Sequence, residues 1–293
     1  MMLIDPARDD FVTVNGLRFH YVQWGVQGPP VVCLHGTTVN AFSFQAIADG
    51  LAADHRVYAY DLRGRGDSDK PTTGYSAPLH AADLAALLDI FGLARPVIIG
   101  HSLGAFVALY FAAHYPDRVS KLVLIDAGAS LPWSRPQDQP AWLTAAFNRL
   151  GTLVPSFDEY SERLKAAPFI GPYWNNYFAL SYQHDLHVNG DGSVVAKTYR
   201  EAPLEDMRRY DEGRPEDQWA RVQAPTLLMR AGQGLFSDTD HLVTEAAAEE
   251  ARQAINNCTF VNYPTLNHYT IIMGVEPGPV AAIRAFIDKE DHS

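Results

Sequence analysis

The chain has 293 residues, of which 47% are apolar and 19% are charged, and its formal net charge is −11 at pH 7. A chain of this length and composition can bury one large core, alone or with a smaller subdomain, which excludes a disordered protein. The acidic balance disfavours nucleic acids and anionic membranes as partners, because phosphate groups bind to clustered lysines and arginines.

The first ten residues contain no apolar stretch long enough for a signal peptide, so a cytoplasmic protein is expected. The longest apolar run, from Leu103 to Ala113, is too short to cross a bilayer and suits a buried helix. Cys33 lies in a predicted strand and Cys258 beside another, which indicates reduced core thiols and not a disulfide framework or a metal site.

Short β-branched runs alternate with helical stretches in the first part of the chain, which predicts an α/β sheet. The predicted strands are Phe11–Val14, Leu17–Trp24, Pro30–Leu34, Arg56–Tyr60, Pro96–Ile99 and Lys121–Ile125. The predicted helices are Phe42–Ala52, Pro78–Phe91 and Leu103–Tyr115. Asn15-Gly16 joins the first two strands and is a strong hairpin signal, so the sheet should begin antiparallel. The later strands are continuously apolar, as in a parallel sheet covered by helices on both faces.

From Ser130 to about Gln218 the alternation gives way to proline-interrupted, aromatic-rich sequence, which we interpret as an inserted, mainly helical cap. Alternation then resumes with strands at Thr226–Met229 and Thr259–Tyr263 and helices at Leu242–Ile255 and Pro279–Lys289. The predicted organisation is a core in two parts, residues 1–129 and 219–293, with a cap at residues 130–218.

The most informative segment is Gly100-His101-Ser102-Leu103-Gly104, which follows an apolar strand and precedes a helix. A sharp turn of this kind strains the backbone at the serine, and glycines two residues before and after it let strand and helix approach without Cβ clashes. Ser102 is therefore the candidate nucleophile. His101 is its neighbour in sequence, so its side chain should point away and act structurally.

A serine needs a base to activate it and an acid to orient that base. His268 is the best placed of the eleven histidines, because it follows the last predicted strand and functional side chains gather at the carboxyl ends of parallel strands. His268 is therefore the candidate general base.

The chain resembles serine hydrolases of the α/β-hydrolase family over nearly its whole length. The matching motifs are Leu34-His35-Gly36-Thr37, the run from Asp61 to Ser68, the turn around Ser102 and the late His268. The resemblance implies a mostly parallel eight-stranded sheet flanked by helices, with an inserted, mainly helical cap. It also implies an oxyanion hole made by the backbone N–H groups of Thr37 and Leu103. His35 and the arginines of the run from Asp61 to Ser68 are expected to brace the site without transferring protons.

The acid is less clear from the sequence. Members of the family usually carry it in a Gly-x-x-Asp turn after the strand at Thr226–Met229, but Gly234 stands at that position here. Asp240 lies 28 residues before His268, a typical interval, and is slightly favoured. Asp126, directly after the strand ending at Ile125, is the rival, and Asp238 comes third.

The resulting prediction is a carboxylesterase-like enzyme, with lactones as possible substrates, that needs no metal ion and no cofactor. Its partner is expected to be a small ester, and a homodimer is possible. Trp133, Trp142, Trp174 and Tyr269 are the candidate substrate-binding residues, since aromatic side chains line apolar pockets. A carbon–carbon bond hydrolase or a thioesterase is the enzymatic alternative, although carbon–carbon bond hydrolases tend to carry Trp where this chain has Tyr269. A noncatalytic ligand-binding protein is the alternative of another class.

Overall fold

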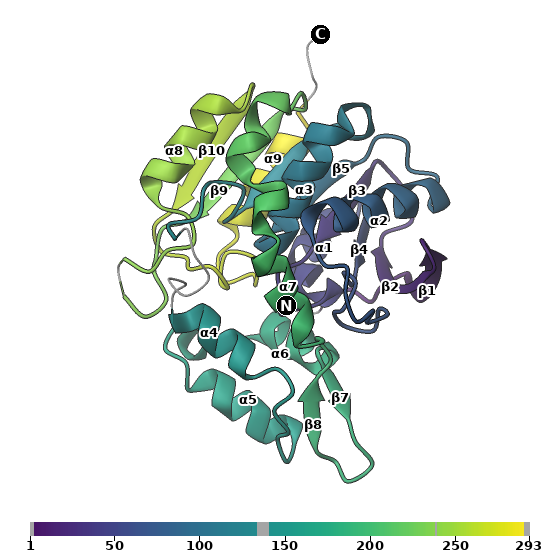
Figure 1. Cartoon of the computed structure of the whole chain (residues 1–293), viewed down its shortest axis with the longest axis vertical. Coiled ribbons are helices and arrows are strands. Elements are labelled where there is room, and N and C mark those ends of the chain that lie inside the picture. The colour runs from purple at the N-terminus through teal and green to yellow at the C-terminus, as the bar shows by residue number, and fades with distance from the viewer. Residues whose placement is uncertain (1–2, 134–140, 238, 290–293) are drawn as a thin grey trace.

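An eight-stranded sheet lies at the centre of the molecule, in the order β1-β2-β4-β3-β5-β6-β9-β10 (Figure 1). The computed structural model describes residues 3–133, 141–237 and 239–289. The strands are β1 Arg8–Val14, β2 Leu17–Trp24, β3 Pro30–Leu34, β4 Arg56–Tyr60, β5 Val97–His101, β6 Leu122–Ile125, β9 Thr226–Ala231 and β10 Cys258–Tyr263. Within this sheet, β2 pairs antiparallel with β1 and with β4, and the remaining neighbours pair in parallel. The expected mostly parallel sheet is confirmed.

The hairpin at the start of the sheet forms where the sequence predicts it. Val14 pairs with Leu17, so Asn15 and Gly16 make a two-residue turn, and both have positive φ, at 51° and 74°. Such a turn matches the twist of antiparallel strands.

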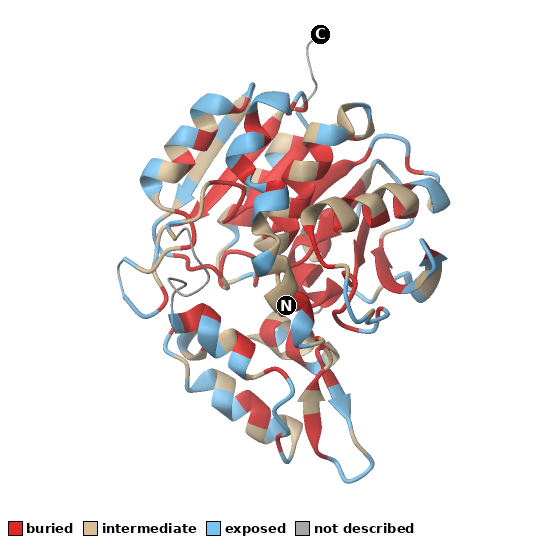
Figure 2. Cartoon of the chain, viewed as in Figure 1, coloured by how far each residue is buried: buried red, intermediate tan, exposed pale blue. Residues whose placement is uncertain are grey.

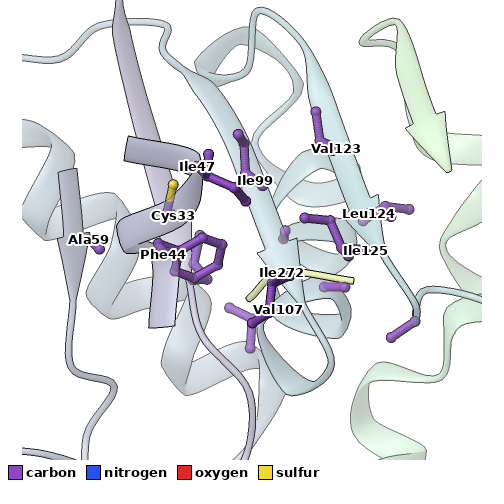
Figure 3. Packing of buried hydrophobic residues seen from close by; sticks show 14 of the residues in the cluster. Cys33, Phe44, Ile47, Ala59, Ile99, Val107, Val123, Leu124, Ile125 and Ile272 are labelled. Carbon is purple, nitrogen blue, oxygen red and sulfur yellow. The ribbon is translucent and has the colours of Figure 1, made fainter. Parts of the chain in front are cut away.

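Helices cover the sheet and bury its central strands. They are α1 Gln45–Leu51, α2 Ala77–Ile90, α3 Leu103–His114, α8 Glu245–Ala254 and α9 Gly278–Ile287. Helix α2 packs against α3, and α1 packs against α9. Strands β5, β6 and β9 are buried along their whole length, as their continuously apolar sequences predict (Figure 2). Cys33, Ile99 and Ile125, from three neighbouring strands, lie in one core cluster with Val107 of α3 (Figure 3).

The segment between β6 and β9, which we call the cap, is mainly helical. It contains α4 Ala141–Asn148, α5 Phe157–Lys165, α6 Asn176–His184 and α7 Glu201–Arg208. It also contains a two-stranded sheet of β7 Leu186–Val188 and β8 Val194–Ala196, which the sequence did not predict. Helices α4, α5 and α6 and this small sheet lie together at one end of the molecule (Figure 1). Within the described ranges, no helix combines the length and the apolarity that a bilayer crossing requires.

The turn between β5 and α3 depends on close backbone approach. A Cβ atom on Gly104 would lie 1.9 Å from the carbonyl oxygen of Leu34, and one on Gly100 would lie 2.3 Å from that of Gly104. Both distances are far below van der Waals contact, and the facing atoms belong to backbone that cannot swing aside. These two glycines therefore allow α3 to begin directly against β3 and β5.

We predict that Gly104→Ala lowers the free energy of unfolding by about 3 kcal/mol or more, because the added methyl group overlaps the backbone of a central strand. Gly190→Ala is the matched control, since nothing lies within 4 Å of its Cβ position, and its effect should stay within about 0.5 kcal/mol. Chemical denaturation followed by circular dichroism measures both. Equal stability of the two variants would contradict the packing argument.

Candidate active site

Ser102 occupies the turn between β5 and α3 with a strained backbone. Its φ is 55° and its ψ is −123°, outside the conformations that a non-glycine residue ordinarily adopts. Its amide donates to the carbonyl of Ile125 in β6 at 3.2 Å, which holds the turn against the sheet. Ser102 lines a small cavity of ≈ 30 Å³ together with His268 and Thr37, and we call this the serine cavity. The structure thus brings the candidate nucleophile and the candidate base to one cavity.

Asp126 is the carboxylate that meets His268. Its Oδ2 lies 2.8 Å from Nδ1 of His268, and its Oδ1 accepts a hydrogen bond from the amide of Ala231 at 2.9 Å. Both side chains are buried, at 2% exposure for Asp126 and 8% for His268. Asp126 follows β6 and Ala231 ends the neighbouring β9, so the carboxylate is fixed between two central strands. With its Nδ1–H donated to Asp126, His268 keeps Nε2 free to accept a proton.

Asp240, the acid that the sequence slightly favours, has other hydrogen-bond partners in the structure. Its carboxylate accepts hydrogen bonds from the amides of Leu235, Phe236 and Ser237, at 2.7, 2.8 and 3.3 Å. Asp240 therefore closes the loop after β9 on itself, because this loop lacks the short Gly-x-x-Asp turn. Asp238, the third candidate, lies outside the described residues.

His101 and Asn267 hold the backbone around His268. The Nε2–H of His101 donates to the carbonyl oxygen of His268 at 2.9 Å, and the two rings lie 4.6 Å apart. Burial lowers the pKa of His101 well below its usual range, so its ring is neutral. The Oδ1 of Asn267 accepts from the amides of Tyr269 and Thr270, both at 3.0 Å. The sequence predicts a structural role for His101, but it does not reveal that the partner is the carbonyl oxygen of His268.

The loop after β3 lies against Ser102. A Cβ atom on Gly36 would be 3.2 Å from that of Ser102, and Thr37 lines the serine cavity. His35 fixes this loop, because its Nδ1–H donates to the Gly36 carbonyl at 2.7 Å and its Nε2 accepts from the amide of Leu62 at 2.9 Å. Burial lowers the pKa of His35 to about 4, so the ring stays neutral and is no proton carrier. Leu103 opens α3, where first-turn amides lack an acceptor within the helix.

Arg65 ties this loop to the cap. Its Nε donates to the Thr37 carbonyl at 3.1 Å, and its other end pairs with Asp206 of α7 at 2.5 Å. His80 also contacts Asp206, at 3.0 Å. Burial opposes ionisation of this carboxyl group, but Arg65 and His80 together hold the pKa of Asp206 at about 2. Arg65 thus makes the bracing contacts expected from its motif.

Two further cavities adjoin the serine cavity, and Trp142 lines all three. One of ≈ 60 Å³, the apolar cavity, is lined by Ser102, Leu103 and Trp133 among others. The other, of ≈ 370 Å³, is the cap cavity and shares Thr38, Trp142, Ala146 and Tyr269 with the serine cavity. Three of the four candidate substrate-binding residues therefore line cavities at the site.

The fourth candidate, Trp174, lines none of these three cavities. Its ring stacks on Phe178 and Tyr182, with centroids 5.9 and 6.0 Å away. Phe178 and Tyr182 both belong to α6, so the Trp174 indole packs on that helix and lies outside the cavities that the other three candidates line.

One group of side chains in the described residues has the spacing of metal ligands: His20, Asp61 and Asp67. His20 lies 2.8 Å from Asp61 and 2.8 Å from Asp9, and Asp61 also accepts from the amides of Ala41 and Asp67. Burial disfavours a charge on His20, but the two aspartates raise its pKa to about 9. The contacts of His20 with Asp61 and Asp9 indicate that this cluster is an ion-paired structural brace.

Comparison with known proteins agrees with the fold. Residues 29–275 match the family model described as alpha/beta hydrolase fold. A non-heme chloroperoxidase of Streptomyces lividans is 31% identical over 87% of this chain and 91% of its own length. A soluble epoxide hydrolase of Corynebacterium sp. (strain C12) is 39% identical over 41% of this chain and 44% of its own length. The chain spans half or less of the length of the first curated relatives it matches.

Among solved structures, E-2-(acetamidomethylene)succinate hydrolase superposes with a TM-score of 0.84 at 24% identity. The superposition covers 96% of this chain and 99% of that one. The chain belongs to the α/β-hydrolase family.

Proposed function

We propose that the protein is a serine hydrolase that cleaves carboxylic esters through an acyl-enzyme. The observation that carries this proposal is the 2.8 Å contact between His268 Nδ1 and Asp126 Oδ2, with Ser102 lining the same cavity as His268. An oriented, buried imidazole beside a strained serine is the arrangement that activates a hydroxyl group for attack.

The mechanism follows from these positions. The Oγ of Ser102 attacks the ester carbonyl carbon while Nε2 of His268 takes the hydroxyl proton. The oxyanion that forms accepts hydrogen bonds from the amide N–H groups of Thr37 and Leu103. Each of these bonds contributes about 3 kcal/mol of transition-state stabilisation. The intermediate collapses, and His268 returns the proton to the leaving alcohol. Water, activated by His268, then attacks the acyl-enzyme and releases the acid and Ser102.

The relatives' names indicate different activities, and two residues of this chain, Ser102 and Tyr269, favour one substrate class over the others. Epoxide hydrolases resemble this fold but use a carboxylate nucleophile at the turn where this chain has Ser102. Tyr269 stands where carbon–carbon bond hydrolases of the family tend to carry Trp. An ester, with a lactone or thioester as a variant of the same acyl chemistry, is the substrate class that Ser102 favours.

We predict that Ser102→Ala lowers kcat for 4-nitrophenyl butanoate by about 10⁴-fold or more, because no other group takes the part of the nucleophile. A fluorophosphonate probe should label the native protein and neither this variant nor heat-denatured native protein. A folded native protein that shows neither turnover nor labelling would instead support a noncatalytic ligand-binding protein.

A second prediction separates the two candidate acids. Asp126→Asn should lower kcat by about 10³- to 10⁴-fold, because an amide no longer stabilises the Nδ1–H tautomer of His268 or its imidazolium form. Asp240→Asn keeps the size and one oxygen acceptor of the loop and should stay within about tenfold of the native kcat. A larger loss in Asp240→Asn than in Asp126→Asn would overturn the assignment of Asp126.

A further inference from the structure

The cap cavity contains a buried cation that the proposed mechanism does not use. Arg149 follows α4 and lines this cavity, and its side chain is 16% exposed. Its Nη1 donates to the hydroxyl oxygen of Tyr160 at 2.6 Å and to Asp185 at 2.7 Å, and its Nη2 donates to the Thr38 carbonyl. A guanidinium has five N–H donors, so two of them have no acceptor among the described residues.

Three tyrosines line the cap cavity together with Arg149. Tyr160 accepts from Arg149, so its own proton is available to a ligand. Tyr182 and Tyr269 also line the cavity, and no hydrogen bond of their hydroxyl groups is made within the described part of the chain. Burial raises the pKa of Tyr160 and of Tyr269 to about 12 and that of Tyr182 well above 10. All three are therefore neutral O–H donors.

Asp185 does not occupy the cavity itself. Its side chain is 1% exposed and Asp185 is absent from the cavity lining, whereas Arg149 is 16% exposed and is part of that lining. Burial raises the pKa of Asp185 to about 6 although Arg149 opposes this rise. Asp185 can therefore take up a proton near neutral pH when a second carboxylate approaches the same guanidinium.

These unpaired hydrogen-bond donors favour a ligand that carries hydrogen-bond acceptors. Arg149 and the three tyrosines together carry five N–H and O–H donors without an acceptor in the described ranges, in the lining of an otherwise mainly apolar cavity that adjoins the serine cavity at Trp142 and Tyr269. Unpaired buried donors are costly, and a carboxylate satisfies several of them at once by charge-assisted hydrogen bonds. We infer that the cap cavity binds a carboxylate carried by the substrate, so that the preferred ester is the monoester of a dicarboxylic acid or the ester of a hydroxy acid.

This inference rests on the proposed function, and its test uses matched pairs of esters. The acyl-side pair is 4-nitrophenyl hydrogen adipate and its neutral carboxamide, and the alcohol-side pair is 6-(butanoyloxy)hexanoic acid and its carboxamide. The members of a pair have the same shape and differ in charge. The readout is the ratio of kcat/KM between acid and amide, with the rate without enzyme subtracted.

The native enzyme should prefer the acid of one pair by about tenfold or more, as expected when charge-assisted hydrogen bonds replace neutral ones. Arg149→Met should bring that ratio close to one, and Arg149→Lys, which keeps the charge but not the planar donors, should give an intermediate ratio. Arg118→Met removes a surface cation of the core that pairs with Asp89, and it should leave the ratio unchanged.

Tyr182→Phe and Tyr269→Phe keep the test decisive if Arg149 variants do not fold, because each removes one oxygen that has no partner within the described residues. Each should lower the acid-to-amide ratio by about threefold, with a smaller change for the amide substrate. A native ratio of one or less in both pairs, or ratios unaffected by these tyrosine variants, would overturn the inference. Native enzyme that hydrolyses the amides without this preference refutes the inference alone, whereas failure on all four esters and on 4-nitrophenyl butanoate refutes the proposed function as well.

Discussion

The site depends on how closely the turn after β5 approaches the end of β3. Helix α3 can begin at Leu103 only because Gly104 has no side chain to strike the carbonyl of Leu34. The same approach sets Ser102 beside the loop of Gly36 and Thr37, and it places Leu103, the first residue of α3, in the lining of the apolar cavity together with Ser102 and Thr37. The positions of Ser102 and Leu103 are thus set by close packing of the backbone.

The cap completes the site through charged side chains as well as through apolar packing. Arg65, from the loop after β4, and Arg149, from the cap, each donate to a carbonyl of the loop after β3, at Thr37 and Thr38. Each is also paired with an aspartate of the cap, Asp206 and Asp185. A displacement of the cap therefore loosens the loop after β3, so the seating of the cap and the positions of Thr37 and Thr38 are linked.

The sequence predicted the sheet, the turn at Ser102 and a place for His268 near that turn, because each leaves a local signal: apolar runs, paired glycines and the end of a strand. The carboxylate that contacts His268 leaves no such local signal in the sequence. Strands β6 and β9 are neighbours in the sheet, so residues that follow either one reach the same place, and only the hydrogen bonds tell Asp126 from Asp240. The pairing of Arg149 with Asp185 joins positions 36 residues apart within the cap, where no periodic pattern connects them.

Asp126 makes the hydrogen bond to His268, and Asp240 of the loop after β9 bonds to amides of its own loop. That loop reaches the cap, since the Trp142 indole N–H donates to the carbonyl of Asp240 at 3.1 Å, and Leu242 beyond it lines the apolar cavity. A change in the length or composition of this stretch therefore reshapes the apolar cavity and its contact with the cap, while the contact between His268 and Asp126 stays in place.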